Sequence, residues 1–130
     1  MIKTASLENS KRLFELAPEW NDTHFWHVEV FAVTEPTISM WEIRDHRGGY
    51  NTFPAPDLEW LLDKLPAGMK SNDRHYAQSG YANLHFVKTP NNTFLAAYYA
   101  SDGIVQFSDN ASDAACLLLI KLIEQGVVKV

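Results

Sequence analysis

The sequence predicts an α+β domain in which an antiparallel sheet carries three helices. Three short strand-like runs between residues 81 and 107 alternate with turn residues, as in an antiparallel meander. Three other segments repeat apolar residues with the period of an α-helix, and residues that start or stop helices bound each one. The 130 residues fit a single domain, 1–130.

The first two helices are predicted from their caps and their apolar spacing. One spans about Ser6 to Ala17, with Ser6 as the N-cap and Pro18 as the stop. The other lies in PAPDLEWLLDKLP, where Pro56 suits the first turn and Pro66 ends the helix. Its apolar stripe has the i, i+3, i+4, i+7 spacing and consists of Leu58, Leu61, Leu62 and Leu65.

The third helix is predicted in SDNASDAACLLLIKLIEQG. Asn110 can cap its N-terminus, with Asp113 three positions later as a short reciprocal capping box. Gly126 suits the left-handed position after its end. Residues 114–123 are apolar nearly all round, with Lys121 as the interruption, so we expect burial on more than one side and packing on the sheet.

The predicted sheet has two parts. The runs YANLHFVK, TFLAAYYA and IVQF form a three-stranded C-terminal meander, with turns at Thr89–Asn92 and Ser101–Gly103. WHVEVFAV and TISMWEIR form an N-terminal hairpin around Glu35–Pro36, and Gly48–Gly49 is the following turn. The polar segment from Gly68 to Gly80 is predicted to be a loop, long enough to bind a ligand.

The composition indicates which cellular compartment and which classes of partner to expect. The net charge of −5, from 16 acidic and 11 basic residues without a clustered basic face, disfavours nucleic acid. The single cysteine cannot form an internal disulfide, and its apolar neighbours in AACLLLI suggest an inert core thiol at Cys116. No signal-peptide core or membrane-length apolar run is present. We therefore expect a cytoplasmic protein without membrane, nucleic-acid or cofactor binding.

The stretch DTHFWH offers the first candidate site. Asp22, His24 and His27 could bind a metal ion if residues 21–25 form a tight turn. If a strand already begins at His24, the two histidines fall on opposite faces and cannot share an ion. We expect the strand, with Trp26 as a core residue.

Two further candidates are binding residues. The predicted loop contains Asp73, Arg74, His75 and Tyr76, which combine an acid, two bases and an aromatic ring. A solvent-exposed loop without a binding role would have the same composition, so that interpretation is the alternative. Trp60 falls off the leucine stripe of its helix, and an exposed tryptophan is a good interface anchor. It could equally cover a sheet edge.

Three segments together resemble a group of small uncharacterised proteins encoded by prophages and mobile elements of Bacteroidales gut bacteria. These segments are SLENSKRLFELAPEWNDTHFW, FPAPDLEWLLDKLP and DNASDAACLLLIKLIEQGVV, which match the group in order and in total length. Ala111 stands where a proline is common in that group. The resemblance implies a cytoplasmic accessory protein of a mobile element, and it brings no activity and no catalytic positions.

These observations favour a non-catalytic accessory protein that binds another protein or itself. No nucleophile motif and no phosphate-binding glycine pattern is present. One alternative is a small metal-dependent hydrolase using Asp22, His24 and His27, or Asp73 with His75. Another is an acidic mimic of nucleic acid, which the interleaving of acids with lysine and arginine argues against.

Overall fold

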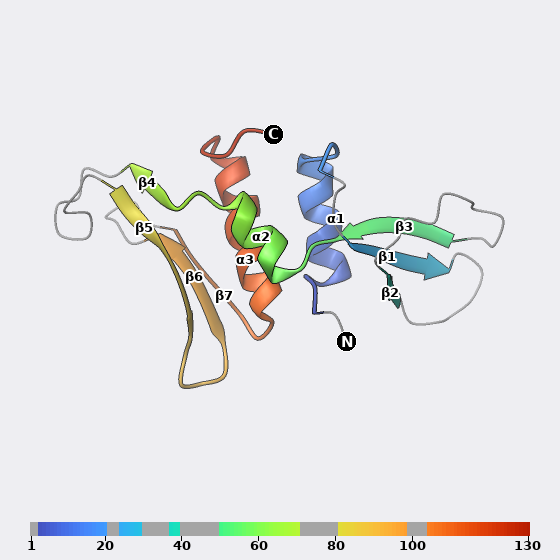
Figure 1. The fold of residues 1–130 in the computed structure, drawn as a ribbon, viewed down its shortest axis with the longest axis horizontal. Helices are drawn as coiled ribbons and strands as arrows, with labels where there is room; N and C mark the ends of the chain where they lie inside the picture. The colour runs from blue at the N-terminus through green and yellow to red at the C-terminus, as the bar shows by residue number, and fades with distance from the viewer. Residues whose placement is uncertain (1–2, 21–23, 30–36, 40–49, 71–80, 99–103) are drawn as a thin grey trace.

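The computed structural model of the chain describes residues 3–20, 24–29, 37–39, 50–70, 81–98 and 104–130. The elements in these ranges are α1 (Leu7–Leu16), β1 (His24–Glu29), β2 (Thr37–Ser39), β3 (Tyr50–Ala55), α2 (Leu58–Lys64), β4 (Gly68–Lys70), β5 (Tyr81–Lys88), β6 (Phe94–Tyr98), β7 (Ile104–Ser108) and α3 (Ala111–Glu124). Two antiparallel sheets flank a central group of helices (Figure 1). The predicted α+β class is confirmed.

The larger sheet has the strand order β4-β5-β6-β7. The predicted meander is confirmed by an unbroken antiparallel register that aligns Val87 with Leu95 and Leu95 with Phe107. Between β5 and β6 the amide of Thr89 donates to the carbonyl of Thr93 at 2.8 Å, and Asn92 takes a left-handed φ of 60°. Asparagine tolerates that conformation, which explains the tight turn. The second predicted turn, 101–103, lies outside the described residues.

Helix α3 packs on one face of this sheet, as predicted. It contacts β6 and β7 on one side and both α1 and α2 on the other, which is why it is apolar nearly all round. Its buried apolar residues are Ala114, Ala115, Cys116, Leu118, Leu119, Ile120 and Leu122. Lys121, the one predicted interruption, is exposed. The core of the described chain is centred on this helix.

The ends of α3 follow the predicted capping pattern in all but one contact. The side chain of Asn110 accepts hydrogen bonds from the amides of Ser112 and Asp113. At the other end Gly126 has φ 74°, and its amide and that of Val127 bond back to Ile123 and Leu122, which is a Schellman motif. The prediction of a reciprocal capping box is wrong. The Asp113 carboxylate does not accept from the amide of Asn110, because it accepts from the amide of Ser6 and the side chain of Asn9 instead.

Helix α1 begins where the sequence predicts. The Ser6 hydroxyl accepts from the amide of Asn9 at 3.3 Å, and the helix ends at Leu16 before Pro18. Helix α2 starts later than predicted. Asp57 is its N-cap, so Pro56 precedes the helix instead of lying in its first turn. The carbonyl of Pro56 accepts from the amide of Ala5 at 2.8 Å, which holds the N-terminal segment beside α2.

The smaller sheet has the order β2-β1-β3 and lies on the other side of the helices from the larger one (Figure 1). β1 and β2 pair antiparallel, as the predicted hairpin requires, with Trp26 opposite Ile38. The hairpin's connection, including Glu35–Pro36, and the predicted turn at Gly48–Gly49 lie outside the described residues. The third strand, β3, pairs with β1 and contacts α1, and it was not predicted from the sequence.

The prediction of one loop from Gly68 to Gly80 is wrong at its start. Gly68–Lys70 form β4, which extends the sheet by pairing with β5, so that Met69 lies opposite Ala82. The remainder, residues 71–80, lies outside the described residues. A three-residue strand leaves too little alternation to be read from the sequence.

Candidate functional site

A hollow of about 640 Å³ lies on the surface of α2. The described residues that line it are Asp57, Glu59, Trp60, Leu62 and Asp63. They combine one large aromatic ring and one leucine with three carboxylates. The predicted binding residue Trp60 therefore lines the hollow, while Glu59, Leu62 and Asp63 were not predicted as site residues.

The amphipathic turn of α2 determines which side chains reach this hollow. Leu61 is fully buried and Leu65 is nearly so, and both belong to the core cluster beneath the helix. Positions 59, 62 and 63 fall on the neighbouring face, because residues three and four apart share one side of a helix, and Leu62 also packs against the core at the edge of the leucine stripe. Glu59 and Asp63 are exposed there, with Leu62 half-buried between them. This i, i+3, i+4 spacing is the signal that could have identified them.

The N-cap of α2 fixes the backbone at Trp60. The carboxylate of Asp57 accepts a 2.9 Å hydrogen bond from the Trp60 amide. An acidic N-cap satisfies an otherwise orphan amide and interacts favourably with the helix dipole. One lining carboxylate therefore also has a structural role at the start of the helix.

Trp60 is half-buried because aromatic residues from the N-terminal part of the chain pack against it. Its ring lies 6.0 Å from that of Phe14 in α1, and 5.9 Å from that of Trp20 in an edge-on arrangement with an interplanar angle of 73°. The ammonium of Lys64 lies 5.1 Å from the ring centroid of Trp20 and 5.2 Å from that of Trp60. These contacts restrict the indole to one position, so it is a preorganised part of the hollow.

The electrostatics of the hollow favour a cation. Three carboxylates surround it, and the face of an indole ring attracts positive charge, as Lys64 already shows. Of the described residues that line the hollow, three are acidic and the other two are apolar. Its chemistry suits the binding of a lysine or arginine side chain.

The structure does not test the predicted metal site. His24 and His27 both belong to β1, three positions apart, and their backbones are part of one continuous strand. Asp22 lies outside the described residues, as do Asp73, Arg74, His75 and Tyr76. Within the described ranges, no group of three or more histidine, cysteine, aspartate or glutamate side chains could hold a metal ion.

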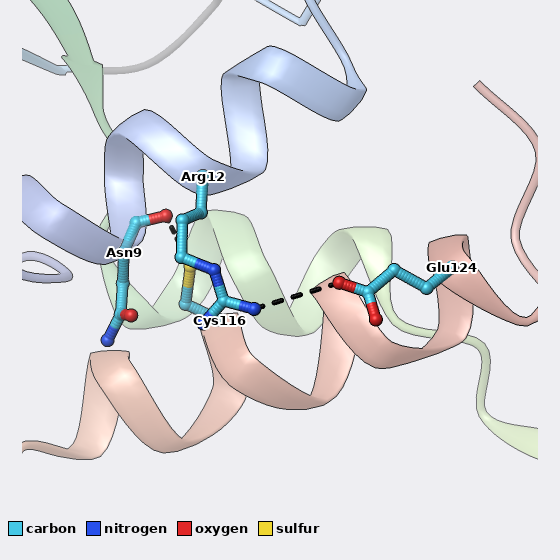
Figure 2. A network of polar contacts seen from close by, with 4 residues as sticks. All are labelled: Asn9, Arg12, Cys116 and Glu124. Carbon is cyan, nitrogen blue, oxygen red and sulfur yellow. Dashed lines mark hydrogen bonds and ion pairs between the residues drawn. The ribbon is translucent and has the colours of Figure 1, made fainter.

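Cys116 lies in the interface between α1 and α3. Its thiol is fully buried and contacts the backbone oxygen of Asn9 at 3.7 Å (Figure 2). Burial, followed by the negative charge of Asp113, raises the pKa of Cys116 to about 12, against a smaller opposing effect of Arg12. At neutral pH the thiol is protonated and enclosed, in agreement with the predicted core role.

Beside this thiol, the exposed edge of the same interface carries an ion pair. Arg12 of α1 and Glu124 of α3 approach to 3.7 Å, and each side chain is about half exposed (Figure 2). A solvated pair of this kind contributes little to stability.

No protein-family model, curated protein or solved structure matches this chain. The resemblance to prophage and mobile-element proteins of Bacteroidales therefore stays a prediction. In the described ranges, no helix combines the length and the apolar character needed to cross a bilayer.

Proposed function

We propose that this chain is a non-catalytic protein-binding protein whose α2 hollow receives a lysine- or arginine-bearing segment of its partner. The observation that carries the proposal is that Trp60 lines one hollow together with the exposed residues Glu59 and Asp63. Aromatic anchors contribute most of the binding energy in many protein interfaces, and surrounding opposite charges select the partner and speed its association.

The packing of Trp60 supports this role. Phe14 and Trp20 already hold the indole in place, so a partner would not have to order it on binding. A preorganised side chain loses little conformational entropy in a complex. In keeping with the family resemblance, we propose a cytoplasmic accessory role in a mobile element, without a nucleic-acid or membrane partner.

Binding of a hexalysine peptide, followed by isothermal titration calorimetry, tests the proposal. The double variant Glu59→Lys/Asp63→Lys should abolish binding, because it reverses two charges beside Trp60. A matched control, Glu15→Lys/Asp109→Lys, makes the same change in net charge at exposed positions elsewhere. The control should bind hexalysine nearly as well as the unmodified chain.

Equal loss in the two double variants would show a dependence on net charge alone and would contradict the site. Trp60→Ala should also lose binding, and far-UV circular dichroism checks that this variant is folded. A hexaglutamate peptide serves as the negative probe. Binding of hexaglutamate as tight as that of hexalysine would contradict the charge argument.

The metal-dependent hydrolase stays an alternative prediction, since its proposed ligands Asp22, Asp73 and His75 lie outside the described residues. Elemental analysis of the purified protein tests it directly. Stoichiometric zinc, manganese or iron would favour this alternative over the binding protein.

A further inference from the structure

Two indole rings and one ammonium group form a cluster beside the α2 hollow. The rings of Trp20 and Trp60 meet edge-on with 5.9 Å between centroids, and the ammonium of Lys64 lies 5.1 Å from the first centroid and 5.2 Å from the second. A cation within about 6 Å of a ring centroid is attracted by the negative face of the ring. Lys64 therefore lies within range of both rings at once. We call the pair Trp20 and Trp60 the indole clamp.

Only one of the two ring contacts of Lys64 follows from helical spacing. Lys64 comes four positions after Trp60 on α2, so their side chains share one side of the helix. Trp20 comes from the turn after α1, and the spacing of α2 does not require its presence. The second ring turns an ordinary contact along a helix into a cation site with two walls.

Both walls of the clamp are held in place without a ligand. The amide of Trp20 donates to the carbonyl of Ala17 at 3.1 Å, which closes a turn with Pro18 at the position that proline favours. The N-cap of α2 fixes the backbone at Trp60, and the ring of Phe14 packs against its indole. A ligand would therefore find the clamp already formed.

The lysine that occupies the clamp is poorly matched to it. A primary ammonium has three N–H donors, and ring faces are weak acceptors for them. Within the described part of the chain Lys64 forms no ion pair, because the pair found there joins Arg12 and Glu124. The Lys64 side chain is half-buried, so water still reaches its ammonium. A better-suited cation can therefore displace it.

A quaternary ammonium group is better suited to two indole walls. It has no N–H donors to leave unsatisfied, its charge is permanent, and its methyl groups contact ring faces directly. The carboxylates of the neighbouring hollow, which shares Trp60 with the clamp, attract cations and repel anions. A neutral group of the same size would fill the clamp but would gain from neither effect.

We infer that the indole clamp binds a quaternary ammonium group, as in choline or a trimethylated lysine, and that Lys64 is its displaceable internal occupant. This inference goes beyond the proposed function and shares only Trp60 with it. Trp20 is not among the described residues that line the hollow, and Glu59 and Asp63 are not part of the clamp. The two proposals can therefore fail separately.

Titration with choline tests the clamp, with the indole N–H signals followed by nuclear magnetic resonance. Choline should shift the signals of Trp20 and Trp60 to saturation. Its carbon analogue, in which carbon replaces the nitrogen, should bind about tenfold more weakly because it lacks the charge. Trp20→Leu should lose choline binding but keep hexalysine binding, since the carboxylates of the hollow remain. Far-UV circular dichroism checks that this variant is folded.

Substitution of Lys64 tests its role as the internal occupant. Lys64→Ala vacates the clamp and should raise the affinity for choline severalfold. The carbon analogue should gain affinity as well, because it is uncharged and responds only to the space that Lys64 leaves. Lys121→Ala removes the same charge at an exposed position of α3 and should change neither affinity.

Equal affinities for choline and its carbon analogue would overturn the inference. So would an unchanged choline affinity in Lys64→Ala, an equal gain in Lys121→Ala, or a gain for choline alone, which the loss of charge would explain. A hexalysine peptide with one trimethylated lysine distinguishes the sources of the group: tighter binding than that of unmodified hexalysine assigns it to a partner's side chain, and equal binding assigns it to a small cation. Choline binding without hexalysine binding would contradict the proposed function and support this inference alone.

Discussion

The carboxylate of Asp113 accepts a 2.7 Å hydrogen bond from the backbone nitrogen of Ser6, a residue 107 positions away in the sequence. Ser6 is the N-cap of α1, and Asp113 lies in the first turn of α3, so one carboxylate serves the N-terminal ends of two helices. The same oxygen accepts from the side-chain nitrogen of Asn9 at 2.9 Å. This contact joins the beginning of the described chain to its last helix.

Replacement of Asp113 by alanine should lower the free energy of unfolding by about 2 kcal/mol. The substitution leaves the partly buried Ser6 amide without its acceptor, and an unsatisfied buried donor costs roughly 1–3 kcal/mol. Urea unfolding measures the loss. Asp109→Ala is the control, since Asp109 is exposed and precedes the helix. Equal losses in the two variants would contradict a specific role for Asp113.

Asn110 should show two separable contributions to stability. Its oxygen caps α3 by accepting from Ser112, and its nitrogen donates to the carbonyl of Thr4 at 3.0 Å. Asn110→Ala removes both and should cost about 1–2 kcal/mol. Asn110→Ser keeps a capping acceptor on a shorter side chain, so it should cost less. If serine and alanine are equally destabilising in urea unfolding, the cap is not the dominant contribution.

At the N-terminus of α3, some contacts follow from the local sequence and others do not. Asn110 and Gly126 were predictable because capping depends on neighbouring residues. The hydrogen-bond partners of the Asp113 carboxylate were not predictable in this way. The Asn110 amide already donates to the Ser108 hydroxyl at 3.2 Å, and the partner of Asp113 comes from a distant segment. Local pattern cannot contain that information.

At the α2 hollow, too, one feature was predictable from the sequence and another was not. That Trp60 leaves the leucine stripe follows from helical spacing. Its contacts with Phe14 and Trp20 arise only when α1 packs beside α2, so the sequence alone could not show that the ring is held in place. β3 was missed because its pairing with β1 is nonlocal and because Pro54 argues against a strand. The structure places Pro54 on an edge strand, where proline is tolerated.

Gly126 should resist substitution for reasons of backbone conformation alone. Its φ is +74°, and a Cβ atom added there would meet nothing within 4 Å. Gly126→Ala should therefore cost about 1 kcal/mol through left-handed strain without a steric clash. Gly126→Asn should cost less, because asparagine tolerates this region. Thermal unfolding of both variants measures the difference, and an alanine variant as stable as the unmodified chain would contradict the assignment.

Cys116 should make the chain sensitive to alkaline pH. Burial raises the pKa of its thiol from 9.0 to about 12, so the folded state holds this proton more tightly than the unfolded state. The resulting stabilisation is complete below the unfolded pKa and is lost as pH rises through the folded one. Linkage gives a loss of about 1.4 kcal/mol in the free energy of unfolding by about pH 10.

Urea unfolding at pH 7 and at pH 10 measures this loss in the unmodified chain and in Cys116→Ala. Alanine lowers stability at both pH values by leaving a small cavity, but it should remove this part of the pH dependence. Burial also raises the pKa of Tyr98, and that contribution is common to both proteins and cancels in the comparison. An identical fall in stability in the two proteins would contradict the role of the buried thiol.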